Sequence, residues 1–344
     1  MSANAIQSIT IKGFKSFDSM SVELRPINLI IGANGSGKSN FIGAFTFLRD
    51  CDRGRLRDYV LAAGGAEKIL HFGSRTTSQM FFRVELEPGQ PLSKFGLMIR
   101  PTQDDSLFAH DEWAQADGRA GNLHWAGGGS LEYWQPFHLH DTSCMRKTAA
   151  LHDNHFLRSD GSNLPAVLYY LREKQSDAYS LLVGTVRQVA PFFDDFRLSP
   201  LELNSDAIQL EWQHRNSDQY FNASSLSDGT LRFIAVATVF LDPRRQRRSL
   251  ILIDEPELGL HPRAIELLAA LIRQASVDTQ VVVSTQSSGL LDHFAPEDVL
   301  VAERVDGGTQ LKRLDSARLA TWLEDYSLGQ LWEKNEFGGL PSLV

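Results

Sequence analysis

The sequence has no apolar run near the roughly 20 residues that a membrane-spanning helix needs. Its first residues, MSANAIQSITIKGFKSF, have neither the long apolar core nor the small-residue cleavage site of a signal peptide. Cysteine is scarce, because Cys51 and Cys144 are the only two and lie far apart in the chain, so no disulfide framework is expected. We therefore expect a protein of the reducing cytoplasm with no membrane partner.

An excess of positive charge is also missing, because the net charge is −8. This balance excludes a surface that is basic all over, but it leaves room for a local patch of Lys and Arg that could bind nucleic acid. The sequence has no internal repeat and no heptad run long enough for a coiled coil. With 42% hydrophobic and 22% charged residues, the composition is that of an ordinary globular protein.

Strand and helix patterns alternate along much of the chain, which indicates a mostly parallel sheet with helices on its faces. The predicted strands cover residues 6–11, 20–24, 27–31, 81–87, 94–100, 208–212, 250–254 and 280–284. The predicted helices cover residues 41–48, 164–174, 179–189, 229–241 and 263–274. Residues 102–129 are polar and rich in glycine, so we expect a surface insertion there.

A glycine-rich loop, GANGSGKSN, follows the apolar run INLII and precedes a helix. It fits the phosphate-binding pattern G-x-x-x-x-G-K-[ST], in which glycines let backbone N–H groups surround phosphates at the positive end of a helix. Lys38 would reach the β- and γ-phosphates, and the Ser39 hydroxyl would bind Mg²⁺. The predicted nucleotide contacts are Asn34, Gly35, Ser36, Gly37, Lys38, Ser39 and Asn40.

A second motif, LILIDEPELGLHP, places two acids directly after a buried strand. The end of such a strand lies at the edge of the sheet that carries the glycine loop, so we expect Asp254 to hold Mg²⁺, through water. Glu255 comes next and is suited to polarising the water that attacks the γ-phosphate. The alternative interpretation of such a pair, an exposed strand end, is disfavoured because the phosphate loop is also present.

A third motif, SLSDGTLRFIAVA, begins a helix with Ser, Asp and Gly, and Asp254 lies 25 positions after Gly229. At this point the sequence resembles the ATP-binding cassette (ABC) superfamily, whose signature LSGGQ is similar to LSDGT. The opening ITIKGFKSF and the stretch ELGLHP are similar to the SMC and RecF branch of these ATPases. Leu226 lies 187 positions after Ser39, and the stretch between them contains no heptads, so the chain resembles the compact, stand-alone bacterial members found in phage-defence operons.

This resemblance implies an α/β fold: an ABC-type, SMC/RecF-like P-loop ATPase head with a mostly parallel core sheet, an antiparallel β subdomain and a helical lobe. One ATPase domain would cover residues 1–344, with an irregular insertion at 102–165 and the helical lobe, including the signature, at 166–245. The stretches HFGS, HLHDTS, STQSS and the closing LGQLWEKNEFGGLP are also similar to that group.

The resemblance further implies ATP and Mg²⁺ as cofactors and a homodimer with two sandwiched ATP molecules. Ser227 and Gly229 of one copy would contact ATP held by Lys38 of the other, across a two-fold interface. Gln286 takes the position of the switch histidine of the superfamily. Because glutamine can donate a hydrogen bond but cannot become charged, this position suits slow, switch-like hydrolysis.

Two further clusters have both a structural and a functional interpretation. Zinc binding by His138, His140, Cys144, His152 and His155 is disfavoured, because their spacing does not match common zinc patterns. The basic runs at residues 53–57 and 244–248 could bind nucleic acid or an acidic partner, although solvated loops are favoured.

The favoured function is an ATP-dependent dimer that controls a separately encoded effector, a nuclease or toxin, in anti-phage defence. A RecF-like DNA-binding ATPase of recombination or repair is the alternative, and the nucleotide-binding subunit of a transporter is disfavoured. The sequence contains no constellation for cleaving nucleic acid, so the chain is predicted to lack nuclease activity of its own.

Overall fold

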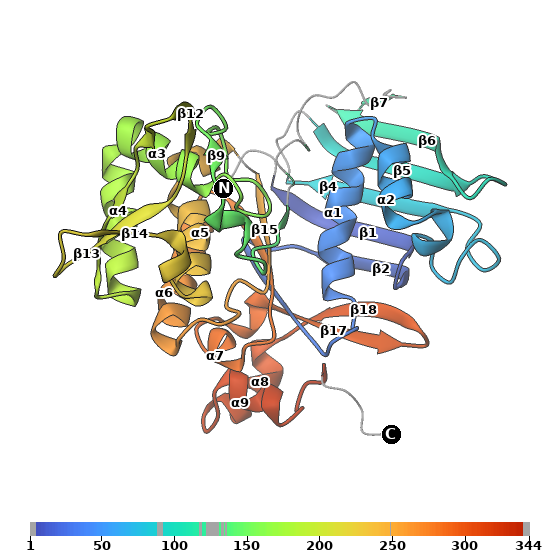
Figure 1. Cartoon of the computed structure of the whole chain (residues 1–344). Coiled ribbons are helices and arrows are strands. Elements are labelled where there is room, and N and C mark those ends of the chain that lie inside the picture. Colours follow the sequence, from blue (N-terminus) through green and yellow to red (C-terminus); the bar gives the residue numbers. More distant parts are fainter. Residues whose placement is uncertain are drawn as a thin grey trace. The chain divides into compact units, whose positions relative to one another are not determined.

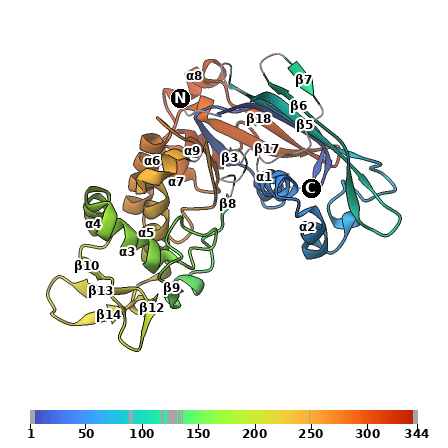
Figure 2. The same ribbon diagram turned by 90° about the horizontal axis from the view of Figure 1, so that it is seen from above.

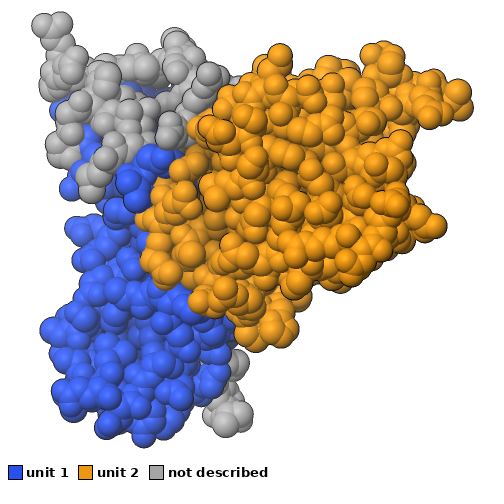
Figure 3. Space-filling model, turned by 90° about the vertical axis from the view of Figure 1, so that its left-hand side faces the viewer, with its two compact units in different colours: residues 1–136, 249–252, 277–344 blue, residues 137–248, 253–276 orange. Residues whose placement is uncertain are grey.

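The computed structural model describes residues 5–87, 92–116, 119–121, 131, 134, 136–247 and 249–339. The chain divides into two compact units, which are coloured separately in Figure 3. Unit 1 contains residues 1–136, 249–252 and 277–344, and unit 2 contains residues 137–248 and 253–276. Each unit has its own helices and its own layers of sheet (Figure 1).

Unit 1 contains an antiparallel sheet with the strand order β2-β1-β4-β5-β6-β7. Its strands are β1 (Ile6–Phe14), β2 (Phe17–Glu23), β4 (Met80–Leu86), β5 (Leu92–Pro101), β6 (Leu107–Ala116) and β7 (Arg119–Gly121). Buried and partly exposed residues alternate along β4, as expected when one face of a sheet packs on a core and the other faces water.

The second sheet has the order β18-β17-β3-β16-β15-β8. Its strands are β3 (Ile27–Ile31), β8 (Pro136–Phe137), β15 (Leu250–Asp254), β16 (Gln280–Ser284), β17 (Val299–Val305) and β18 (Gly308–Arg313). Strand β3 runs parallel to both β16 and β17, whereas β17 and β18 are antiparallel. Every residue of β3, β15 and β16 is buried, which is typical of strands covered on both faces.

Helix α1 (Lys38–Asp52) packs against both sheets of unit 1, and Figure 2 shows it on the inner side of the arc that their strands form. Its Phe41, Phe45 and Phe47 belong to one core together with side chains of β1, β4 and β5 and of β3, β16 and β17. This packing fixes the start of α1 against the end of β3. The remaining helices of unit 1 are α2 (Leu56–Ala63), α7 (Ser288–Leu291), α8 (Ser316–Leu323) and α9 (Leu328–Glu333).

Unit 2 is built around α5 (Asp228–Leu241), whose residues from Leu231 to Leu241 are all buried. It also contains α3 (Leu164–Lys174), α4 (Ser176–Val189) and α6 (Pro262–Ala275), of which α4 and α6 both contact α5. One small sheet has the order β10 (Phe193–Arg197), β13 (Glu211–His214), β14 (Tyr220–Asn222). The other has the order β11 (Pro200–Leu201), β12 (Asn204–Ile208), β9 (Ala149–Ala150).

The predicted fold class is confirmed, but two local predictions differ from the structure. Residues 107–116, inside the expected irregular insertion, form strand β6, whose side chains are mostly exposed or half-buried and so lack an apolar pattern. The single strand predicted over 208–212 is wrong, because β12 ends at Ile208 and β13 begins at Glu211. Ile208 and Trp212 are both buried, so the alternation of buried and half-buried side chains continues through residues 209–210, which connect the two strands. Much of the rest of the glycine-rich stretch, residues 122–129, lies outside the described residues.

Candidate nucleotide site

The phosphate loop of unit 1 connects the end of β3 to the first residue of α1. Gly37 caps this helix with a left-handed backbone, at φ 109°, and no side chain caps the helix. A Cβ atom at Gly37 would lie 2.3 Å from the Thr309 hydroxyl oxygen, so there is no space for a side chain. The loop therefore requires glycine here, and no capping side chain occupies the N–H groups of the first turn.

Lys38 is 5% exposed, and its ammonium donates hydrogen bonds to the carbonyl oxygens of Gly32 at 2.7 Å and Ala33 at 3.0 Å. The Ser36 hydroxyl is also buried, and it has no hydrogen-bond partner within the part of the chain that the structure describes. An orphaned hydroxyl beside a buried ammonium and a helix N-terminus is a suitable environment for a bound phosphate. The residues of the loop therefore fit the phosphates of a nucleoside triphosphate.

Two residues that no sequence motif had assigned to this site support the loop from outside. The Thr309 hydroxyl donates to the Ser36 carbonyl at 2.8 Å, and its N–H donates to the Ser16 carbonyl at 2.7 Å. The Asn40 amide donates to the Ser16 hydroxyl at 2.9 Å. Ser16 lies in the FKSF motif, which indicates the resemblance to the family but does not predict this contact. Thr309 lies about 270 residues after Ser36 in sequence, and no motif predicts its contact with the loop.

Two further predicted site residues of unit 1, Ser39 and Gln286, lie at the start of α1 and just after the end of β16. Ser39 is exposed in the first turn of α1, directly after Lys38. Gln286 is exposed two residues after β16, and the N–H of its neighbour Thr285 donates to the Ile30 carbonyl at 2.9 Å. Because β16 runs parallel to β3, their carboxyl ends share one sheet edge. Gln286 therefore follows the strand end next to the phosphate loop.

Asp254 ends strand β15 and is 7% exposed, so its carboxylate is largely withdrawn from solvent. Two histidines of unit 2 lie against it. His138 places Nδ1 3.6 Å from a carboxylate oxygen of Asp254, and Nε2 of His140 lies 3.0 Å from the Asp254 carbonyl oxygen. The first two histidines of the stretch from His138 to His155 therefore contact Asp254. The described residues contain no group of three or more His, Cys, Asp or Glu side chains that could hold a metal ion by themselves.

Glu255 has a left-handed backbone, at φ 43°, and its carbonyl accepts a hydrogen bond from Leu258 at 3.3 Å. A residue with a Cβ atom is strained in this region by about 1 kcal/mol, which the surrounding fold must offset. Strained backbones are concentrated at functional sites, and Glu255 is one of six described non-glycine residues with a positive φ.

The signature motif lies at the start of α5. The Ser227 hydroxyl accepts a hydrogen bond from the Thr230 N–H at 3.1 Å and so caps the helix. A Cβ atom at Gly229 would lie 2.3 Å from the Gly259 carbonyl oxygen, so a glycine is needed for this close approach of two backbones. The signature is therefore packed directly on the ELGLHP loop that follows the two acids.

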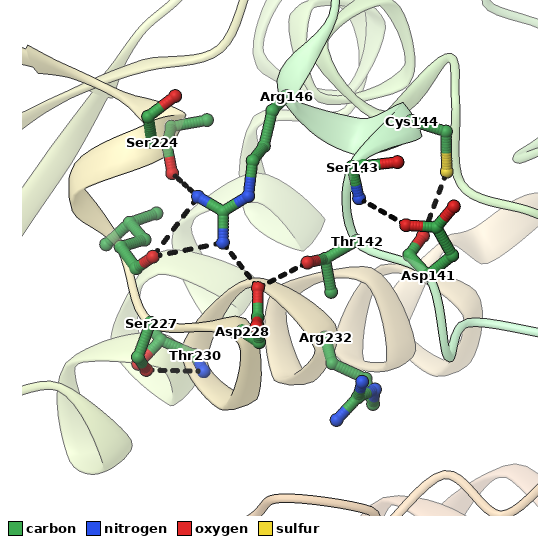
Figure 4. A network of polar contacts seen from close by, with 12 residues as sticks. Asp141, Thr142, Ser143, Cys144, Arg146, Ser224, Ser227, Asp228, Thr230 and Arg232 are labelled. Carbon is green, nitrogen blue, oxygen red and sulfur yellow. Dashed lines mark hydrogen bonds and ion pairs between the residues drawn. The ribbon is translucent and has the colours of Figure 1, made fainter.

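Figure 4 shows that Asp228, in the same motif, is held by side chains from residues 142–146. Arg146 donates to the Asp228 carboxylate at 2.6 Å, and the Thr142 hydroxyl donates to the same oxygen. Arg146 also donates to the carbonyl oxygens of Ala223 and Leu226. The hydrogen bonds from Thr142 and Arg146 hold the pKa of Asp228 below its usual 3.8.

Arg232, one turn after the signature, is 5% exposed and connects three segments of unit 2. Its guanidinium donates to the carbonyl oxygens of Leu139 at 2.9 Å and His140 at 2.8 Å, and also to that of Leu258. Burial lowers the pKa of Arg232. Residues 138–146 thus contact Asp254 with their first part and the signature helix with their last part. No sequence motif predicted this arrangement.

The basic clusters contain arginines with structural partners. Arg244 is paired with Asp242 at 2.7 Å, and its guanidinium lies 4.1 Å from the centre of the Tyr170 ring. Arg55 is paired with Asp50 at 2.6 Å. Arg244 is also largely buried, so its main contribution is to pack unit 2.

The two units each contain one group of the predicted site residues. Unit 1 contains residues 34–40 and Gln286, and unit 2 contains Ser227, Gly229, Asp254 and Glu255.

Two family models match the chain. One, described as "AAA domain, putative AbiEii toxin, Type IV TA system", matches residues 130–292, and the other, described as "AAA ATPase domain", matches residues 5–81. A search of curated proteins found no match.

Several solved structures are similar to the whole chain. An SMC head bound to the C-winged helix domain of ScpA is 18% identical, with a TM-score of 0.67, over 92% of this chain and 99% of that chain. A Pyrococcus furiosus Smc head domain with an extended coiled coil, bound to the C-terminal domain of ScpA, is 15% identical, with a TM-score of 0.63, over 94% and 99%. A Pyrococcus yayanosii Smc head with a coiled coil and joint is 13% identical, with a TM-score of 0.58, over 94% and 99%.

The chain therefore has the fold of an SMC head domain. The predicted SMC-head-like fold is confirmed, and both family models that match parts of the chain describe AAA domains. No helix in the described ranges is long and apolar enough to cross a membrane.

Proposed function

We propose that the chain binds and hydrolyses ATP and that two copies associate around two ATP molecules. The observation that carries this proposal is the phosphate loop. Its glycine-capped helix start, its buried Lys38 and the orphaned hydroxyl of Ser36 offer donors to a triphosphate. The matches to ATPase families and the SMC-head fold support the same conclusion.

In this proposal the loop residues Asn34 to Asn40 bind the phosphates through backbone N–H groups and the Lys38 ammonium. The Ser39 hydroxyl and the Asp254 carboxylate supply oxygen ligands of the type that Mg²⁺ prefers. The metal would neutralise charge on the β- and γ-phosphates. Glu255 accepts the proton of the attacking water, and Gln286 orients that water or the γ-phosphate by donating a hydrogen bond.

The signature acts on the second copy. Ser227 and the backbone of Gly229 would donate hydrogen bonds to the γ-phosphate of ATP held by the other chain, so that neither site is complete in a monomer. Removal of the γ-phosphate by hydrolysis would then loosen the dimer, which makes the chain a switch. The exposure of Ser227 at a helix N-terminus supports this role.

We infer further that the switch controls a separately encoded effector, a nuclease or toxin, in defence against phage. The family description that names a type IV toxin–antitoxin system supports a defence role. The SMC heads bound to parts of ScpA support the idea that a head of this fold carries a protein partner. The alternative function is a RecF-like role on DNA, and isolating the protein with its bound partners distinguishes the two.

The first experiment measures the molar mass of the Glu255→Gln variant by light scattering, with and without ATP and Mg²⁺. Because the carboxylate is needed for the attack and not for affinity, we expect a stable dimer in ATP and a monomer without it. The matched control adds Ser227→Arg, which places a bulky cation at the signature and should prevent dimerisation while each monomer still binds ATP. A dimer of unchanged mass in this control would contradict the interface.

The second experiment isolates tagged Glu255→Gln protein, expressed with its neighbouring reading frames, in ATP and Mg²⁺. A stoichiometric second polypeptide supports the effector role. DNA without a second protein would favour the RecF-like role instead.

A further inference from the structure

The signature of this chain contains an acid where the resemblance to LSGGQ leads one to expect a glycine. Asp228 is the first residue of α5, directly between Ser227 and Gly229. A carboxylate is favourable at a helix N-terminus considered alone. Under the proposed function, however, the same N-terminus meets the triphosphate of a second copy, and two anions that close repel each other.

The structure contains a counter-ion for this acid. Arg146 reaches it from a segment 82 residues earlier in the chain, with a nitrogen 2.6 Å from the carboxylate. The Thr142 hydroxyl donates to the same carboxylate oxygen. The Asp228 side chain is still 69% exposed, whereas that of Arg146 is 20% exposed. The acid therefore faces solvent at the signature, while its partner is anchored behind it (Figure 4).

Arg146 is held by more than this ion pair. Its guanidinium also donates to the carbonyl oxygens of Ala223 and Leu226, the residues that lead into the helix. One cation thus fixes both the backbone before the signature and the acid inside it. Lysine could supply the charge but not these several directed hydrogen bonds, because only the guanidinium presents a planar fork of donors.

We propose that Arg146 is a positioning residue of the signature: it holds the loop from Ala223 to Leu226 in place and neutralises Asp228, so that an acidic signature accepts the triphosphate of a second copy. This inference rests on the proposed function, because it assigns Asp228 a place beside that triphosphate. It follows that Arg146 and Asp228 depend on each other, and that the loss of Arg146 is harmful mainly because Asp228 remains.

The experiment is a double-mutant cycle in the Glu255→Gln protein. The dissociation constant of the dimer in ATP and Mg²⁺ is measured by analytical ultracentrifugation for Arg146→Ala, Asp228→Asn and the double variant. Arg146→Ala should weaken the dimer at least about 10-fold, as expected when one partner of a charge pair is left alone at an interface. Asp228→Asn should strengthen the dimer in the Arg146→Ala background, whereas in the parent, where Arg146 already neutralises the acid, it should change the dissociation constant little.

This rescue of Arg146→Ala by Asp228→Asn is a readout that a purely structural role would not give. If Arg146 only stabilised the fold, Asp228→Asn would have no effect or add a further loss in the double variant, and the proposal would be wrong. Binding of a fluorescent ATP analogue to each monomer serves as the control and should be unchanged, since Lys38 and its loop are untouched. A loss of that binding would also contradict the proposal.

A conservative variant covers the case in which Arg146→Ala folds poorly. Arg146→Lys keeps the charge near Asp228 and loses the fork, so its dimer affinity should lie between those of the parent and Arg146→Ala. An affinity equal to that of the parent would show that the hydrogen bonds to Ala223 and Leu226 have no role. If the Glu255→Gln parent itself stays monomeric in ATP, the proposed function fails, and this inference fails with it.

Discussion

The two glycine-containing helix starts of this protein, at α1 and at α5, are built in different ways. At α1 the cap is Gly37, with a left-handed backbone and no capping side chain, and Lys38 folds back onto its own loop. At α5 the cap is Ser227, with an ordinary extended backbone, and its side chain closes the first turn. The first helix start is thus shaped mainly by its own backbone, with support from Ser16 and Thr309 of the same unit.

The second helix start takes its shape from contacts that are distant in sequence. Arg146 and Thr142 hold Asp228, while Arg232 connects α5 to Leu139, His140 and Leu258. A locally built loop should bind its ligand independently of the other unit. A loop held by distant contacts should respond to changes elsewhere in its unit, which suits a switch.

Lys38→Ala should give the largest effect on nucleotide binding. It removes the buried ammonium of the phosphate loop, and a hydrogen-bonded charge facing phosphate is worth about 2–3 kcal/mol, so ATP affinity should fall about 100-fold. Isothermal titration calorimetry with ATP and Mg²⁺ measures this change. Lys12→Ala, at an exposed lysine of β1, is the matched control and should leave the affinity unchanged. An equal loss in both variants would mean that Lys38 acts only through net charge.

Arg232→Leu should give the largest effect on stability. The change leaves three carbonyl oxygens of unit 2 without their donor in a buried place, and we expect the free energy of unfolding to fall by about 3–5 kcal/mol. Urea denaturation followed by circular dichroism measures this loss. Arg263→Leu is the matched control on α6, because Arg263 is exposed and paired with Glu266, so its loss should be within about 0.5 kcal/mol.

The same variant also sharpens the comparison between the two helix starts. If the signature depends on distant contacts and the phosphate loop does not, Arg232→Leu should weaken the ATP-dependent dimer in the Glu255→Gln background. ATP binding by the monomer should be little changed below the unfolding transition. A variant that loses ATP binding as strongly as Lys38→Ala would show that the two loops are not independent.

The difference between the two helix starts also explains what the sequence could predict. The phosphate loop was predicted residue by residue, because strand, glycine loop and helix follow each other directly and the geometry is local. The signature was located by its likeness to LSGGQ, but Arg146, Thr142 and Arg232 were missed, since their contacts join residues 26 to 93 positions apart. Ser16 and Thr309 were missed for the same reason.

In the fold, the buried strands and helices were predicted because continuous apolar runs and helical periodicity are strong signals. Strand β6 was not, because its apolar residues do not alternate regularly with polar ones and its side chains are mostly accessible. The basic run at residues 244–248 suggested a solvated surface, yet Arg244 packs against Tyr170 and pairs with Asp242. Charge in a sequence does not reveal which arginine is buried beside a ring.

Gly35→Ala should give the smallest effect and tests whether the phosphate loop depends on its own backbone conformation. Gly35 has φ 78°, and a Cβ atom there would meet no atom within 4 Å, so the change introduces backbone strain of about 1–2 kcal/mol and no clash. Gly54→Ala is the matched control, because Gly54 has φ 69° and equally open surroundings, outside the loop. Both variants should lose similar stability in urea denaturation. Only Gly35→Ala should also lose ATP affinity, by about 3- to 10-fold, since the strain is released by moving the N–H groups that we propose bind the phosphates. Equal ATP affinity in the two variants would mean that the loop tolerates a changed backbone at this residue and that the Lys38 side chain, not the left-handed turn, determines phosphate binding.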